Sequence, residues 1–262
     1  MPELPEVETV VRSVRDQLLG RRILAAEFTS RHVTPGNRSA LAKRLVGCQI
    51  VAITRRGKFI QMALDRGFLT VHLGMTGKLL LQNPPDAHVY GVFTLDQGTL
   101  HYHDPRQFGT IEWSEEVSPR VARLGPEPLE ITLEEFRKRI KRKARIKALL
   151  LNQTFLAGVG NIYADESLFA AGIHPLANAR TLSKPRVEKL YAAIQGILAH
   201  AIRLGGSSIS DYVDGTGQKG WFQVEHRVYG REGEPCAQCG TPIRKTLVAQ
   251  RGTHYCPKCQ KR

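Results

Sequence analysis

Residues 236–259 read CAQCGTPIRKTLVAQRGTHYCPKC, and this stretch decides the fold of the C-terminal end of the chain. Its cysteines form two CxxC pairs, Cys236 with Cys239 and Cys256 with Cys259. Each pair can present two thiolates to one tetrahedral metal ion, and closed sites of four cysteines with this spacing are structural zinc sites. Disulfides are the alternative, but cytosolic chains keep their thiols reduced. We therefore predict one structural Zn²⁺ on these four cysteines.

Between the two pairs, residues 241–255 alternate in hydrophobicity like two strands, which leaves no length for a helix. The sequence predicts a hairpin whose turn lies at Gln250–Gly252, with Arg251 at the tip. An arginine at such a tip is usually only solvated. On a basic protein beside a metal site, it is also placed to contact a polyanion.

The composition indicates such a partner. The 262 residues carry a formal net charge of +14, and a field of that sign attracts phosphates. Nucleic acid is the first expectation for the partner, and an anionic membrane surface is the second. No apolar run approaches the roughly 20 residues needed to span a bilayer, and the start lacks the basic-then-apolar pattern of a signal peptide. We expect an intracellular, cytoplasmic protein.

The body of the chain divides at residues 123–130, RLGPEPLE, which read as a linker. Short strand-like runs separated by turns precede it and predict an antiparallel β-sandwich or barrel over residues 1–124. After a linker at 125–131, helical spacing predicts a helical domain over 132–230, and the zinc hairpin occupies 231–262. The expected fold class is α+β, with an N-terminal helix on the sandwich.

That N-terminal helix begins in the opening residues, MPELPEVETV. Pro5 and Glu6 suit a first helical turn, and apolar residues at helical spacing predict a helix from about Pro5 to Leu19. This interpretation explains neither Pro2 nor Glu3, because both precede the first turn.

Residues 137–147, RKRIKRKARIK, hold eight lysines or arginines in eleven positions. Such a run repels itself unless acidic groups lie against it. A solvated helix face is the structural interpretation, and a phosphate-binding surface is the functional one. Gly158, Gly160 and Asn161 then precede a helix, where backbone N–H groups can seat an anion, although a glycine-rich turn alone is weak evidence.

These segments together resemble the bacterial formamidopyrimidine-DNA glycosylases. The resemblance rests on PELPEVE at the start, RRGKF at 55–59, HLGMTGKL at 72–79, HDPRQFG at 103–109, GVGNIYADE at 158–166 and QRGTHYCPKCQ at the end. It runs from end to end and in order. It implies a β-sandwich, a helix-two-turns-helix domain and a zinc finger in a base-excision repair enzyme. Such an enzyme removes oxidised purines from DNA and then cuts the strand at the abasic site.

The resemblance implies roles for the residues that the helix left unexplained. After removal of Met1, the amine of Pro2 is the nucleophile that forms a Schiff base with the sugar C1′, and Glu3 is the general acid and base. An α-amino group has a lower reference pKa than a lysine, so more of it is neutral at pH 7. Lys58 matches the family's second catalytic lysine, and Arg251 matches the hairpin arginine of the final δ-elimination.

Binding roles follow from the same resemblance. Met75, Arg106 and Phe108 match the wedge that fills the space of a flipped-out nucleotide. Ordinary core packing is the alternative for Met75 and Phe108. The glycine-rich segment 205–221 resembles a mobile lid over the lesion base, with Ser207 and Tyr212 as its lid residues. The positions that match phosphate contacts are His72, His88, Arg142, Lys147 and Asn161.

One position departs from the pattern, because Gln107 stands where a basic residue is expected between Arg106 and Phe108. Two other functions stay open at this stage. An endonuclease VIII-like enzyme for oxidised pyrimidines shares the architecture, although Leu4 and the DPRQFG segment count against it. A zinc-ribbon protein that binds nucleic acid without catalysis is the other alternative. We expect a monomer that acts on double-stranded DNA.

Overall fold

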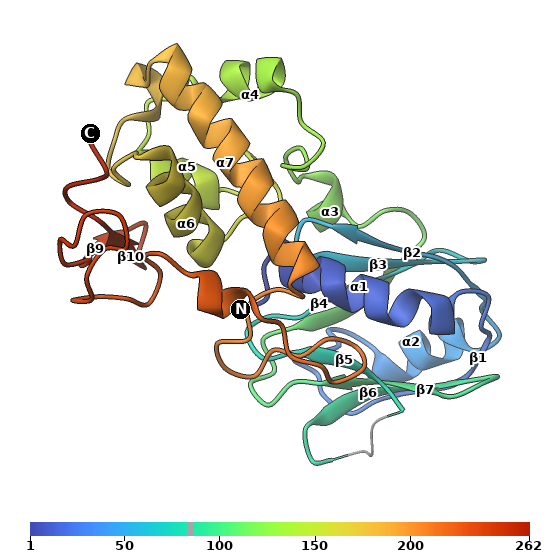
Figure 1. Ribbon diagram of the computed structural model, residues 1–262. Helices are drawn as coiled ribbons and strands as arrows, with labels where there is room; N and C mark the ends of the chain where they lie inside the picture. The colour runs from blue at the N-terminus through green and yellow to red at the C-terminus, as the bar shows by residue number, and fades with distance from the viewer. Residues whose placement is uncertain (83–85) are drawn as a thin grey trace. The chain divides into compact units, whose positions relative to one another are not determined.

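The computed structural model describes residues 1–82 and 86–262. The chain forms two compact units, which are drawn in Figure 1. Unit 1 contains Met1–Arg123 and Leu204–Trp221, and unit 2 contains Leu124–Arg203 and Phe222–Arg262. Residues 204–221, expected in the helical domain, therefore have their contacts in unit 1. Residues 125–131, expected as a linker, belong to unit 2, where the N–H of Gly125 donates to the carbonyl of Gln153 at 2.8 Å.

Unit 1 is built on two antiparallel sheets. Along the first sheet, the order is β1 (Ile23–Phe28), β6 (Val89–Leu95), β7 (Thr99–His103) and β5 (Lys78–Leu81). Along the second, the order is β2 (Ile50–Arg56), β3 (Phe59–Leu64), β4 (Phe68–His72) and β8 (Thr110–Ser114). The unit also has α2 (Arg38–Leu45) and α3 (Pro119–Ala122). The predicted antiparallel sandwich is confirmed.

The N-terminal helix α1 spans Leu4–Leu18, one residue from the predicted start and end. A capping box fixes its first turn, since the N–H of Glu3 donates to Oε2 of Glu6 at 2.8 Å. Its apolar stripe is buried in the core of unit 1, where α1 contacts β2, β3 and β5 (Figure 1). The members of this stripe are Val7, Val10, Val11, Val14 and Leu18.

Two loops pass from one sheet to the other at the same end of the sandwich. Residues 73–77 connect β4 to β5, and residues 104–109 connect β7 to β8. Strand pairing sets them side by side, because His72 pairs with Thr110 and Lys78 pairs with His103. The two backbones touch, since a Cβ on Gly74 would lie 2.5 Å from the nitrogen of Gly109. Only glycine allows this approach.

Unit 2 contains most of the remaining helices and the terminal hairpin. Its elements are α4 (Leu133–Ile140), α5 (Ile146–Leu151), α6 (Asn161–Ala171), η1 (Ala179–Thr181), α7 (Lys184–Arg203), η2 (Phe222–Glu225), β9 (Arg244–Val248) and β10 (Arg251–Tyr255). The long helix α7 packs against α4 and α6 with a buried stripe that includes Leu190, Ile194 and Leu198. The α+β fold class is therefore confirmed. Within the described ranges, no helix is long and apolar enough to cross a membrane.

The hairpin turn lies one position earlier than predicted. Val248 pairs with Arg251, so the turn consists of Ala249 and Gln250, and Gly252 lies inside β10 opposite Leu247. Both turn residues have positive φ, 49° and 58°, as a two-residue hairpin turn requires. The prediction placed the turn around the glycine, whereas here residues other than glycine adopt the left-handed backbone.

The basic run 137–147 is partly neutralised within unit 2. On α4, Arg137 pairs with Glu188, Lys138 pairs with Glu134 at 2.6 Å and Arg139 pairs with Glu135 at 3.8 Å. The helix ends at Ile140, so the run does not form one continuous helix face. Its exposed basic residues beyond α4 are Lys141, Arg142, Lys143 and Arg145.

Candidate active site and zinc centre

The N-terminus of unit 1 brings together three of the four residues that the sequence singled out for chemistry, Pro2, Glu3 and Lys58. Pro2 is buried, Glu3 is 3% exposed, and Lys58, in the turn between β2 and β3, is 7% exposed. Burial lowers the pKa of the Met1 amine; Glu3 and Glu6 oppose this shift, while Lys58 and Arg106 add to it. Two carboxylates and two cations therefore act on the chain terminus. Such surroundings favour a neutral amine, the form that attacks carbon.

Glu6 is a site residue that sequence reasoning missed. Its carboxylate is 2% exposed and accepts two backbone hydrogen bonds, from Glu3 at 2.8 Å and from Ser207 at 2.7 Å. A Cβ on Gly206 would lie 2.7 Å from Oε1 of Glu6. The sequence explained Glu6 by the helix dipole alone, because its second partner lies 201 residues away along the chain.

The two predicted lid residues both meet this first turn of α1. Ser207 is 5% exposed and Tyr212 is 9% exposed, and the hydroxyl of Tyr212 donates to the carbonyl oxygen of Glu6 at 3.1 Å. Burial and the nearby Glu6 carboxylate raise the pKa of Tyr212 above its usual range. In this structure the segment 204–221 is thus packed on the helix that carries the N-terminus.

The proposed wedge residues lie on the two crossing loops and face solvent. Met75 is 43% exposed and Phe108 is 57% exposed. The core-packing alternative is therefore wrong for both. Arg106 is also exposed, and its Cζ lies 4.6 Å from the centre of the Phe108 ring, a cation–π contact. The structure brings these three side chains to one end of unit 1.

Two histidines predicted to contact phosphate lie beside these loops. His72 ends β4, and its Nδ1 accepts the N–H of Gly74 at 3.2 Å. Burial lowers the pKa of His72 to about 4, with Arg120 and Lys58 acting in the same direction. His72 is therefore neutral at pH 7, so it can offer an N–H but not a positive charge. His88 is exposed, and its carbonyl accepts the N–H of Asp104 at 3.0 Å.

In unit 2, Arg142 and Arg251 are both exposed, whereas Asn161 is half-buried. Asn161 is the first residue of α6, and its Nδ2 donates to the carbonyl of Gly252 at 2.9 Å. This contact sets the start of α6 beside the residue that follows Arg251. A second hydrogen on Nδ2 stays available for another acceptor.

Lys147 does not fit the predicted role of a phosphate contact. Its side chain is fully buried, and its ammonium pairs with Asp165 at 2.7 Å. It also donates to Oγ1 of Thr253 at 2.8 Å and to the carbonyl of Gly252 at 3.2 Å. A buried lysine needs such a counterion, but its sequence neighbours gave no sign of Asp165. Lys147 thus fastens β10 to the helices rather than facing solvent.

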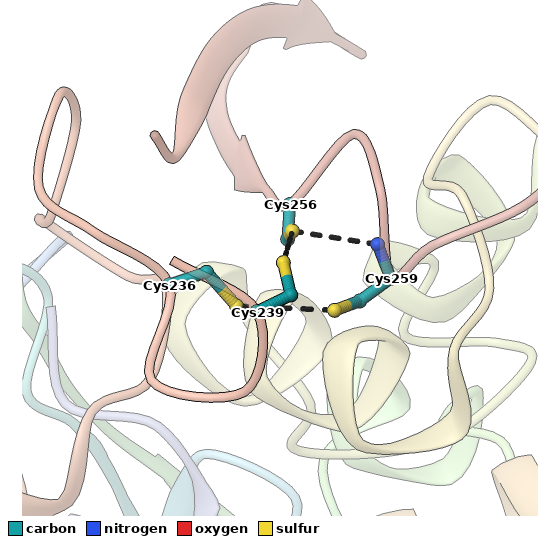
Figure 2. Close-up of side chains that lie close together, drawn as sticks. All are labelled: Cys236, Cys239, Cys256 and Cys259. Carbon is teal, nitrogen blue, oxygen red and sulfur yellow. Dashed lines mark hydrogen bonds between the residues drawn. The ribbon is translucent and has the colours of Figure 1, made fainter. Parts of the chain in front are cut away.

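Figure 2 shows the four C-terminal cysteines converging from two turns. Their Sγ atoms all lie within 4.8 Å of one another. Cys236 and Cys259 are 3.9 Å apart at Sγ, and Cys239 and Cys256 are 3.5 Å apart. Tetrahedral Zn²⁺ with bonds of about 2.3 Å requires sulfur separations of about 3.8 Å. The residues fit the ion, and the four cysteines form one structural zinc site.

The zinc site supports a small part of unit 2 that has few apolar contacts of its own. Besides the cysteines, its hydrophobic cluster contains Phe169, Val228 and Ile243. Cys239→Ser is therefore expected to unfold residues 233–262 locally while the two sheets of unit 1 stay folded. The measurements are zinc content per chain and protease sensitivity of the C-terminal segment.

The matched control for this variant is Cys48→Ser. Cys48 is fully buried near α2, far along the chain from the zinc site, and should keep one zinc per chain. A Cys239→Ser chain that resists proteolysis after complete loss of metal would contradict a structural zinc site.

Comparison with known families agrees with this arrangement. Residues 1–111 match the model of the formamidopyrimidine-DNA glycosylase N-terminal domain, and residues 124–213 match that of the formamidopyrimidine-DNA glycosylase H2TH domain. Residues 233–262 match the zinc finger found in FPG and IleRS. Together these matches define an enzyme of the DNA glycosylase class with a zinc finger.

Similar proteins cover the whole chain. The formamidopyrimidine-DNA glycosylase of Solibacter usitatus is 58% identical over 265 residues, covering 100% of both chains, and that of Geobacillus kaustophilus is 42% identical with the same coverage. The crystal structure of the MutM (FPG) protein from Thermus thermophilus has a TM-score of 0.90 at 42% identity, covering 99% of this chain and 98% of that one. A Lactococcus lactis FPG mutant in complex with Fapy-dG-containing DNA has a TM-score of 0.92 at 39% identity, covering 100% of both chains. This chain belongs to the formamidopyrimidine-DNA glycosylase family.

Proposed function

We propose that this enzyme removes oxidised purines, such as 8-oxoguanine and formamidopyrimidines, from double-stranded DNA and then cleaves the strand at the abasic site. The observation that carries the proposal is the burial of Pro2 and Glu3 beside a chain terminus whose amine also feels the charges of Lys58 and Arg106. The Lactococcus lactis relatives bound to Fapy-dG-containing DNA and to abasic-site DNA support this substrate class. The excess of positive charge suits the DNA backbone.

The chemistry assigned to the N-terminus starts with Pro2 after removal of Met1. Its neutral amine attacks C1′ of the damaged nucleotide, and the bond from C1′ to the base breaks as the base takes up a proton. Glu3 supplies and removes protons while the base leaves and the sugar ring opens. The product is an iminium ion with no N–H to lose, which acts as an electron sink for the elimination steps.

Strand cleavage follows from this iminium ion. Loss of a proton from C2′ expels the 3′ phosphate in β-elimination, and loss of the second phosphate in δ-elimination completes the cut. Lys58 is assigned to phosphate contact and to assistance of base excision and β-elimination. Arg251 is assigned to DNA contact and to δ-elimination. Lys58 is buried beside the N-terminus of unit 1, whereas Arg251 is exposed on β10.

DNA binding is assigned to four of the five phosphate positions and to the wedge. His72, His88, Arg142 and Asn161 contact phosphates, while Lys147 acts only through β10. Segment 205–221, with Ser207 and Tyr212, closes over the flipped base. We propose a monomeric enzyme that works on the chromosome in the cytoplasm, because its substrate is genomic DNA.

Substrate choice is tested by comparing single-turnover excision on two duplexes, one with 8-oxoguanine and one with an oxidised pyrimidine. We expect faster excision of the purine. Preference for the pyrimidine would favour the endonuclease VIII-like alternative. Absence of any covalent trapping on either duplex would favour a zinc-ribbon protein without catalysis.

Phe108→Ala is expected to slow excision from duplex DNA by about 10-fold or more, because the ring no longer fills the space left by the flipped nucleotide. The same variant should lose much less activity on a lesion that faces a one-nucleotide gap, which is already unstacked. Equal losses on both substrates would contradict the wedge. The melting temperature should not fall, because the ring is 57% exposed.

A further inference from the structure

Asp104 is a fully buried carboxylate to which neither the sequence nor the proposed reaction gives a role. It follows β7 directly and opens the loop 104–109 that carries Arg106 and Phe108. Oδ1 of Asp104 accepts the hydroxyl of Thr76 at 2.6 Å, and Oδ2 accepts the N–H of Gly109 at 2.8 Å. One carboxylate therefore binds both crossing loops, beside Met75 on one and beside Phe108 on the other.

The backbone of Asp104 makes two more connections to the same region. Its N–H donates to the carbonyl of His88 at 3.0 Å, and its carbonyl accepts the N–H of Gln107 at 3.0 Å. The hydroxyl of Tyr102 also lies 3.4 Å from Oδ2. Met75, Arg106 and Phe108 thus each lie within two residues of Asp104 or of a residue bonded to it.

The side chain of Gln107 adds two further hydrogen bonds to the loop 104–109. Its Oε1 accepts the hydroxyl of Ser30 at 2.5 Å, and its Nε2 donates to the hydroxyl of Tyr90 at 3.2 Å. The residue has a φ of 52°, and its half-buried side chain makes these bonds while its neighbours Arg106 and Phe108 are exposed. Glutamine at this position therefore attaches the loop 104–109 to Ser30 and Tyr90, and it offers no charge to DNA.

We propose that Asp104 is a positioning residue. It holds loops 73–77 and 104–109 in one geometry, in which Met75 and Phe108 are placed to enter the base stack. The inference rests on the proposed wedge function of these loops. Ordering loose loops during insertion would cost conformational entropy, and loops that are already ordered avoid that cost. The carboxylate suits this task, because one group with several acceptor sites satisfies a hydroxyl and a backbone N–H at once.

The test compares Asp104→Ala with Asp104→Asn. The alanine leaves the N–H of Gly109 and the hydroxyl of Thr76 without their acceptor, whereas asparagine can accept from Gly109 and donate to Thr76. Insertion is followed by stopped-flow fluorescence of 2-aminopurine next to 8-oxoguanine, and excision by single-turnover rates on duplex and gapped substrates. Asp104→Ala should slow insertion and duplex excision by about 10-fold or more, and Asp104→Asn by no more than about 3-fold.

Asp96→Ala is the matched control, because it removes a carboxylate that accepts backbone N–H groups of Arg22 and Gln97 at the other end of β7. It should leave insertion unchanged. Thr76→Val removes only one hydroxyl from the network and should slow insertion by a few fold, with a fall in melting temperature of only a few degrees. This variant provides the test if Asp104→Ala does not fold.

The outcomes separate this inference from the wedge function itself. If Phe108→Ala impairs insertion but Asp104→Ala and Thr76→Val do not, Asp104 has no positioning role. If Asp104→Ala loses equal activity on duplex and gapped DNA, its effect is on the fold of unit 1 and the inference is overturned. If Phe108→Ala leaves insertion intact, the wedge assignment fails.

Discussion

Enzyme that retains Met1 is expected to form no covalent adduct with 8-oxoguanine DNA upon borohydride reduction, whereas enzyme that begins at Pro2 should be trapped efficiently. With Met1 in place, the nitrogen of Pro2 is an amide and cannot attack C1′. The α-amine of this form belongs to Met1, one residue away from the assigned nucleophile, and the other amines are lysines, of which only on the order of one in 10³ is neutral at pH 7. Excision should therefore fall by at least about 10²-fold.

Both forms can be produced from the same sequence by inhibiting methionine removal during expression, and mass spectrometry gives their proportions. The trapped adduct is then digested and mapped. A mass shift on the N-terminal peptide at Pro2 agrees with the assignment. An adduct on a lysine, or equal trapping of both forms, would show that Pro2 is not the nucleophile.

Glu3→Gln should separate the two halves of the reaction. The substitution keeps the shape of the side chain but removes the group that exchanges protons. We expect excision of 8-oxoguanine to fall by at least about 10²-fold, in line with general acid–base contributions. Cleavage at a preformed abasic site should fall much less, because the base has already left and part of the sugar is an open aldehyde.

Single-turnover rates for both substrates are measured on one preparation. Glu8→Gln serves as the matched control, since Glu8 lies on the same helix and its carboxylate pairs with Arg12 and Arg55. It should change neither rate by a comparable factor. If Glu3→Gln lowers both rates equally, Glu3 does not act mainly in base release.

Local sequence pattern predicted much of the fold because the relevant forces are local. The spacing of Val7, Val10 and Val14 sets α1, and the two CxxC pairs set the zinc site, whose ligands the structure brings together. The hairpin turn was misplaced by one residue because the preference of glycine for turns was outweighed by the register of β9 and β10.

The contacts that sequence could not predict join residues far apart in the chain. Glu6 meets Ser207, Lys147 meets Asp165 and Thr253, and Asp104 meets Thr76. A single sequence gives the chemistry of each partner but not their pairing. The burial of Lys147 shows the difficulty, because a lysine within a basic run gives no local sign that it faces inward.

The paired state of the basic run also changes how the enzyme should respond to ionic strength. Four of its eight cations, Arg137, Lys138, Arg139 and Lys147, already have carboxylate partners, so DNA that approaches them must compete with those carboxylates. The other four cations are Lys141, Arg142, Lys143 and Arg145. Only phosphates that these four neutralise release condensed counterions without that competition. At one phosphate for each of these four, the run contributes a slope of at most about −3.6 to log K against log salt, half of what its composition implies. Affinity near this segment is correspondingly less sensitive to salt than a count of lysines and arginines suggests.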